Sequence, residues 1–210
     1  MHARERAQLV ESVAMQQLVT ESAVALANGR PVHVGPVTLR PRYLTAAESP
    51  PDPDDRTDVT GGYGAKDVAG ATDPRQTFSA LTAWTVAVGI AHARGGASSL
   101  TLVESWGPRG VVDATGRPYP AAEAVGWLAE ERRAELWVPD RPTAPDLWVA
   151  GARSDGRLVL FAANLSEVAI TVTVTSSDGP VWTVDVEPSG SRRGVLRFDH
   201  HDSEGVSGWR

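Results

Sequence analysis

The sequence predicts an α/β region followed by an all-β region, and two observations support this. Before residue 135, stretches with helical periodicity alternate with two short runs of mainly aliphatic and β-branched residues. Such alternation is typical of parallel strands joined by crossover helices. After residue 135, short strand-like runs follow one another with Asp-Gly turn signals between them. We therefore expect a partial α/β domain at residues 1–135, a small antiparallel β-sandwich at 136–200 and a polar tail at 201–210.

The α/β region contains three predicted helices and two predicted strands. Asn28-Gly29 provides an end for the first helix, and Asp73-Pro74 provides a capped start for the second. Pro36 lies inside the first strand, which predicts a bulge or an early strand end there. The predicted helices span residues 4–28, 74–94 and 120–133, the strands 31–39 and 99–104, and the loops 43–72 and 105–119. Two parallel strands do not close a barrel, so we expect this region to be incomplete unless a partner supplies further strands.

The all-β region contains five predicted strands. They span residues 146–153, 157–164, 168–176, 181–187 and 194–198. Residues 168–175 alternate between apolar and polar side chains, which predicts one buried and one solvent-facing side.

Composition excludes several classes of function. The net charge is −6 and no Lys/Arg cluster occurs, so we expect no nucleic-acid partner. The chain has no cysteine, which excludes thiolate nucleophiles and Cys-based zinc sites. No apolar stretch has the length of a signal peptide core or a membrane span. We expect a cytoplasmic protein with neither a membrane partner nor a metal or other cofactor.

Glu104 is the strongest candidate for a catalytic residue. It ends the predicted strand 99–104, and polar residues at the carboxyl ends of barrel strands line the active face. A carboxylate there can act as a general base towards water or can hold sugar hydroxyls. The alternative is a structural glutamate paired with an arginine.

Other polar residues are candidates for substrate binding. Arg40 and Arg42 follow the first predicted strand, where guanidinium groups could hold a carboxylate or stabilise an oxyanion. The alternative for these two is a salt-bridged surface pair. Asp73 and Arg75 could lie at the same active face, at the carboxyl ends of the strands, although Asp73 is equally suited to cap a helix.

Several motifs together resemble one known family. They are PVHVGPVTLRPRY (residues 31–43), DPRQ (73–76), TAWTVAVG (82–89), SLTLVESWGPRGV (99–111) and PAAEAVGWLAE (120–130). This pattern resembles the C-terminal half of the D-apionate lactonase family, whose architecture is similar to that of retaining glycoside hydrolases.

The resemblance implies a fold and an activity. The fold would be the C-terminal portion of a (β/α)8 TIM barrel, with its last two β/α units, followed by a β-sandwich. The activity would be hydrolysis of a sugar-acid lactone. Glu104, Trp106, Gly107 and Gly110 match the motif after the last barrel strand, and Arg109 lies within it.

Two features depart from the family pattern. The part corresponding to the first six strand–helix units is absent, and the strand ending at Arg40 has no carboxylate where a glycosidase would place its nucleophile. The first hypothesis is therefore a lactonase-like hydrolase fragment that is inactive by itself, with Glu104 as base, arginines at the oxyanion, and Trp106 and Arg109 contacting the sugar. The alternatives are a glycoside hydrolase-type fragment and a non-catalytic, sugar-binding remnant. Met1 falls within a predicted barrel helix, so we expect an upstream-encoded polypeptide that completes the barrel.

Overall fold

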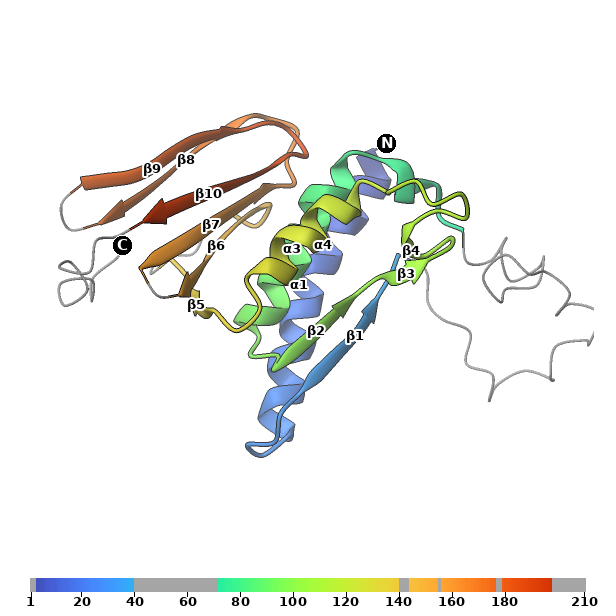
Figure 1. Ribbon diagram of the computed structural model, residues 1–210, viewed down its shortest axis with the longest axis horizontal. Coiled ribbons are helices and arrows are strands. Elements are labelled where there is room, and N and C mark those ends of the chain that lie inside the picture. The colour runs from blue at the N-terminus through green and yellow to red at the C-terminus, as the bar shows by residue number, and fades with distance from the viewer. Residues whose placement is uncertain (1–2, 40–71, 140–143, 155, 177–178, 198–210) are drawn as a thin grey trace, which may run out of the picture.

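The computed structural model describes residues 3–39, 72–139, 144–154, 156–176 and 179–197 (Figure 1). Almost all of the predicted loop 43–72 and the whole tail 201–210 lie outside these residues. No helix in the described part of the chain is both long enough and apolar enough to span a membrane.

The α/β half contains the predicted helices and a parallel strand pair. The elements are α1 Ala3–Leu26, β1 His33–Val37, the 3-10 helix η2 Pro74–Thr77, α3 Ala80–Arg94, β2 Ser99–Leu102 and α4 Ala121–Glu130. Strands β1 and β2 pair in parallel. The register between them shifts between Val34 and Val37, so the irregularity predicted at Pro36 is confirmed.

The structure corrects three predicted segments of this half. The helix predicted at residues 74–94 is interrupted, because Phe78 has extended backbone angles between η2 and α3. The strand predicted at 99–104 ends at Leu102, because Val103 adopts a left-handed φ of 54°. The predicted loop 105–119 contains part of a second parallel pair, β3 Glu104–Trp106 with β4 Gly110–Val112. Glu104 therefore begins a new short strand beyond β2.

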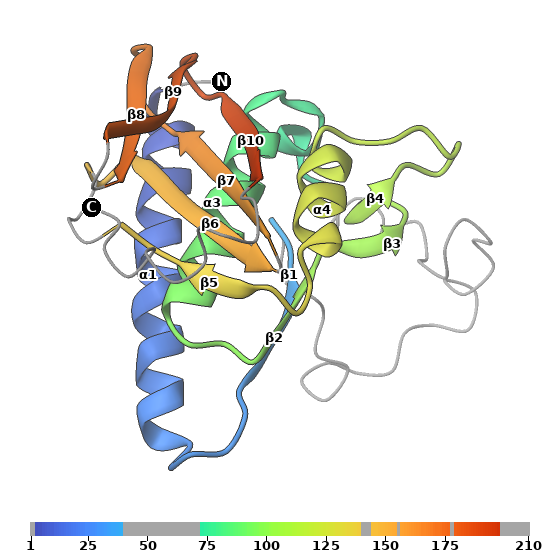
Figure 2. The same ribbon diagram turned by 60° about the vertical axis from the view of Figure 1, so that its left-hand side comes forward.

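The all-β half contains the five predicted strands and one that was not predicted. The strands are β5 Glu135–Trp137, β6 Leu147–Ser154, β7 Arg157–Asn164, β8 Ile170–Ser176, β9 Gly179–Val186 and β10 Ser191–Arg197. Four of them form an antiparallel sheet in the order β10-β7-β6-β5, and β8 pairs with β9 in a hairpin (Figure 2). Strand β5 is too short for its periodicity to be recognised in the sequence.

The space between the four-stranded sheet and the hairpin β8–β9 is filled by apolar side chains. Leu158 and Leu160 of β7 pack in one buried cluster with Val172, Val174 and Val186 of the hairpin. Val172 and Val174 are buried while Thr171 and Thr173 are exposed, which confirms the alternation predicted for this strand.

The opposite face of the same sheet packs on helix α3. Ala150 of β6 and Phe161 of β7 belong to one buried cluster with Val86 and Ile90 of α3. Helix α3 lies between this sheet and the pair β1–β2, as the ribbon shows (Figure 1). Its residues 83–92 are all buried, because the helix has packed neighbours on every side.

Candidate functional site

Glu104 and Arg109 form a largely buried ion pair just beyond the carboxyl end of β2. Arg109 Nε donates to Glu104 Oε1 at 3.2 Å, and the side chains are 6% and 11% exposed, respectively. The backbone N–H of Glu104 also donates to the Arg109 carbonyl, at 2.9 Å. The predicted catalytic residue is thus held by the arginine five positions later in the chain. A carboxylate in this setting has a fixed orientation and a compensated charge.

Two glycines allow the tight turn that brings Arg109 back to Glu104. Gly107 has a φ of 92°, which L-residues with side chains rarely adopt. A Cβ on Gly110 would lie 2.5 Å from the carbonyl carbon of Trp106, so only glycine fits there. Trp106 is 38% exposed at this turn, where its indole can offer an apolar face to a ligand.

Gln76 supports the turn from η2 and was not identified from the sequence. Its side-chain amide Nε2 donates to the Gly110 carbonyl at 3.0 Å, and the residue is only 4% exposed. Gln76 therefore connects the segment 73–77 to the turn that carries Arg109. Its presence in the DPRQ motif was the available signal, but the partner lies 34 residues away in the sequence.

Asp73 acts as the cap of η2 and as the ion-pair partner of Arg75. Its Oδ1 accepts from the Arg75 backbone N–H at 2.9 Å. The Arg75 guanidinium donates to both carboxylate oxygens, at 2.9 Å from Nε and 2.7 Å from Nη2. The capping role considered from the sequence is therefore present, and Asp73 is 3% exposed. Arg40 and Arg42 lie outside the described residues.

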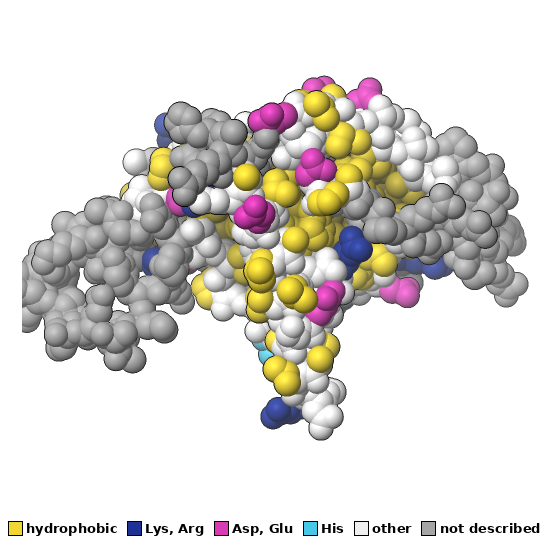
Figure 3. All heavy atoms as spheres, turned by 180° about the vertical axis from the view of Figure 1, so that it is seen from behind, with side chains coloured by type: hydrophobic (Ala, Val, Ile, Leu, Met, Phe, Trp, Pro, Cys, Tyr) yellow, Lys and Arg dark blue, Asp and Glu magenta, His cyan; other side chains and the backbone are white. Residues whose placement is uncertain are grey.

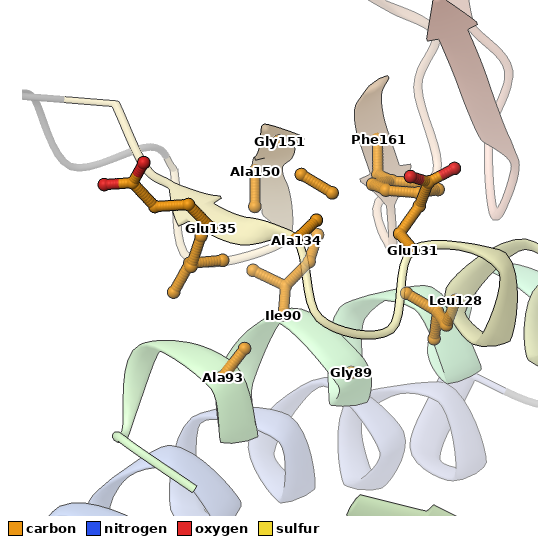
Figure 4. A pocket seen from close by; sticks show the side chains of 12 residues that line it. Gly89, Ile90, Ala93, Leu128, Glu131, Ala134, Glu135, Ala150, Gly151 and Phe161 are labelled. Carbon is orange, nitrogen blue, oxygen red and sulfur yellow. The ribbon is translucent and has the colours of Figure 1, made fainter. Parts of the chain in front are cut away.

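A cavity of about 160 Å³ lies away from Glu104, between α3, the end of α4 and the four-stranded sheet. Figure 4 shows the side chains of Ile90, Leu128 and Phe161 around it, with Glu131 at its border. Its lining is mostly apolar, with the carboxylates of Glu131 and Glu135 as its charged groups. Among the described residues, no group of three or more His, Asp or Glu side chains is arranged to hold a metal ion.

Glu131 connects α4 to the sheet through two arginines. Its Oε2 accepts from Arg157 Nη2 of β7 at 2.5 Å, and its Oε1 accepts from Arg193 Nη2 of β10 at 2.9 Å. The Glu131 side chain is 4% exposed. A buried carboxylate needs such partners, because an unpaired one would be costly to desolvate.

His92 is a buried titratable group between α1 and α3. Its Nδ1 lies 2.8 Å from the Thr20 hydroxyl and its Nε2 lies 2.9 Å from Gln16 Oε1. Burial lowers the pKa of His92 below its ordinary value of 6.5. The Thr20 hydroxyl also donates to the Gln16 backbone carbonyl at 2.8 Å, so Thr20 and Gln16 of α1 together hold the His92 ring.

Comparisons with known proteins assign the α/β half to a family. Residues 1–133 match the family model described as "D-apionate lactonase, TIM barrel domain". No curated protein matches the chain. Among solved structures, the chain is similar to a GH30 endoxylanase from Clostridium papyrosolvens C71, with 13% identity and a TM-score of 0.36. That alignment covers 82% of this chain and 40% of the endoxylanase chain, so this chain spans less than half of that protein. Since the family match covers most of its length, the chain belongs to the D-apionate lactonase TIM barrel domain family, as its motifs predicted.

Proposed function

We propose that this chain is the C-terminal part of a carbohydrate-active hydrolase that opens sugar-acid lactones, and that it is inactive by itself. The family match over residues 1–133 is the observation that carries the proposal, since it includes β1, β2 and the turn with Glu104 and Arg109. The substrate class is taken from the family, and D-apionolactone is the first compound to test. We place the protein in the cytoplasm.

In this proposal, β1 and β2 are the last two strands of a (β/α)8 barrel within residues 1–135, and residues 136–200 are a β-sandwich domain. A closed barrel of this type needs eight parallel strands, and β1 and β2 form a pair of two. The isolated pair therefore supplies only part of a barrel mouth. Because catalysis depends on several groups held in position together, turnover requires the rest of the barrel.

The proposed chemistry uses Glu104 as general base. Glu104 takes a proton from water while the water oxygen bonds to the lactone carbonyl carbon. The tetrahedral oxyanion is stabilised by guanidinium groups, for which Arg40, Arg42 and Arg109 are the candidates. The ring C–O bond then breaks, and the proton passes from Glu104 to the departing alkoxide. Trp106, exposed beside this turn, packs on the sugar face.

Lactone opening requires fewer catalytic groups than glycoside cleavage. Glycoside hydrolysis uses two carboxylates on either side of the bond. Within residues 104–110, Glu104 supplies the carboxylate, which is paired with Arg109. Asp73 is paired with Arg75 and caps η2, so we assign it no catalytic role. An ester carbonyl can be attacked with one base and one cationic oxyanion site, which favours the lactonase proposal over a glycosidase fragment.

One observation supports a second candidate, a non-catalytic carbohydrate-binding protein. Arg109 Nε forms an ion pair with Glu104 Oε1 at 3.2 Å, and both side chains are largely buried. This is the geometry of a structural ion pair, which would hold the turn and leave Trp106 as a sugar-stacking surface.

A pH-stat assay on D-apionolactone and related sugar lactones tests the two candidates. The purified chain is assayed alone and together with the polypeptide encoded directly upstream of it. Turnover in the mixture that disappears in Glu104→Gln, but persists in the control Glu123→Gln on the exposed side of α4, supports the lactonase. A silent mixture in which sugar acids still bind supports the non-catalytic candidate.

A further inference from the structure

The cavity of about 160 Å³ between α3, the end of α4 and the four-stranded sheet is bounded by three separate parts of the fold. Ile90 of α3 and Phe161 of β7 line it and are each 3% exposed. Leu128 contributes from α4. The side chains of Ala93 and Ala150 point toward the cavity from α3 and from β6 (Figure 4). The cavity lies apart from the turn between β3 and β4.

Small residues leave this space open. The lining includes two glycines and four alanines, which are Gly89, Ala93, Ala134, Ala150, Gly151 and Ala152. A Cβ on Gly89 would lie 2.6 Å from Leu128 Cδ1, so α3 and α4 are already in close contact there and cannot approach further to fill the space. Protein interiors are otherwise packed closely, with few voids larger than a water molecule. The cavity is therefore a distinct feature of this fold.

This cavity differs from the apolar side chains on the outer surface. Figure 3 shows such side chains in yellow on the side seen from behind, including the narrow end of the molecule. Apolar side chains on a surface are common and do not by themselves indicate a ligand. A concave, mostly apolar space bounded by several elements is instead the usual form of a small-molecule site. Sites for drug-sized molecules have volumes of about 300–1,000 Å³, so this one suits a smaller ligand.

The size and the lining of the cavity select the type of occupant. Apolar cavities of about 150 Å³ lined by Leu, Ile and Phe side chains stay dry and bind benzene. Water is a poor occupant of such a space, because each buried water needs two to four polar partners. An aromatic or alicyclic ring instead contacts apolar walls on both faces and gains dispersion energy there.

The charges around the cavity favour an uncharged ligand. Glu131 borders the cavity, but its Oε2 already accepts from Arg157 and its Oε1 from Arg193. Glu135 is exposed to solvent, where an added ion pair contributes little. A ligand carboxylate or ammonium group would therefore lose its hydration without gaining a strong partner.

We propose that this cavity binds a small uncharged compound with one aromatic or alicyclic ring, of about six to eight non-hydrogen atoms. The ring lies between Ile90 and Phe161. It enters beside β5, where Leu136 borders the cavity and is 41% exposed. The site is separate from the turn with Glu104 and does not depend on the proposed lactone hydrolysis.

Titration of the full chain with benzene, followed by NMR of the backbone amides and by thermal unfolding, tests the site. We expect a Kd of about 1 mM or below, with shifts centred on Ile90, Ala150 and Phe161. Benzene at ten times its Kd should raise the folded-to-unfolded ratio by roughly tenfold. Benzoate, the same ring with a carboxylate, should bind at least about tenfold more weakly.

Two variants change the volume of the cavity in opposite directions. Ala93→Leu fills part of it and should weaken benzene binding by at least about tenfold. The matched control is Ala129→Leu, the same change at an exposed position of α4 outside the lining, which should alter the Kd by less than about threefold. If Ala93→Leu does not fold, Leu128→Ala serves instead. It enlarges the cavity and should bind naphthalene at least about tenfold more tightly than the unchanged chain does.

Three outcomes would overturn the proposed site. They are benzene-induced shifts that lie away from α3, β6 and β7 or do not occur, a folded Ala93→Leu that binds benzene with unchanged affinity, and benzoate that binds as tightly as benzene. In the absence of a folded Ala93→Leu, equal naphthalene affinity of Leu128→Ala and the unchanged chain would have the same meaning. None of these measurements uses a lactone, so failure of this site and failure of the proposed function are distinguishable.

Discussion

Replacing Phe161 with alanine tests whether the sheet and helix α3 share one core. Phe161 of β7 is 3% exposed and lies in the cluster that contains Val86 and Ile90 of α3. Truncating a buried phenylalanine to alanine costs about 3–5 kcal/mol in the free energy of unfolding. Phe161 also borders the cavity of about 160 Å³, so one side of its ring has fewer contacts to lose. We therefore expect a loss near 3 kcal/mol, at the lower end of that range.

The assay is urea and thermal unfolding, with hydrogen exchange of the α3 amides as a local probe. A loss of about 3 kcal/mol corresponds to a Tm lower by roughly 6–12 °C for a chain of this size. Because the core is shared, the α3 amides should lose protection together with those of β6 and β7. Val195→Ala on β10, at a position 47% exposed, is the control and should change stability by no more than about 0.5 kcal/mol. Unchanged protection of α3 in Phe161→Ala would refute the shared core and show that the two halves unfold independently.

Three further predictions concern the polar contacts. Gln76→Leu removes the donor to the Gly110 carbonyl, so stability should fall by about 1–3 kcal/mol and the Glu104 amide should exchange faster; an unchanged exchange rate would contradict the supporting role. Glu131→Gln removes the charge that binds two arginines, and urea unfolding should show a loss of about 1–3 kcal/mol that 1 M salt reduces only in part. The pKa of His92 is lowered in the folded chain, so the unfolded chain binds the proton more readily below about pH 6.5. Stability should therefore fall as the pH drops from 7 to 5, and His92→Gln should lose that part of the dependence; equal pH slopes in both proteins would exclude His92 as its source.

Local patterns in the sequence were sufficient to predict most helices and strands. The period of apolar residues identified α1, α3 and α4, and short β-branched runs identified β1, β2 and the five longer strands of the all-β half. The position of Pro36 predicted the irregularity in β1. These features depend on neighbouring residues, which the sequence shows directly.

The candidate site was predicted only in part. Glu104, Trp106 and Arg109 were selected from one short motif, and the structure brings Glu104 and Arg109 together as the ion pair weighed as the alternative. The left-handed Val103 that separates Glu104 from β2 was not predicted, because valine disfavours that conformation and only its surroundings impose it.

Sequence patterns were enough to predict the order of the longer elements, the family and the chemical types of the site residues. The fold was needed to show which distant residues meet: Gln76 with the Gly110 carbonyl, Glu131 with Arg193, and the sheet with α3. The cause is that a period of apolar residues indicates a helix or a strand but does not show which residues of the chain cover its apolar side chains. In α1, Leu18, Val19 and Leu26 contributed to the helical period, and the structure shows that all three are exposed.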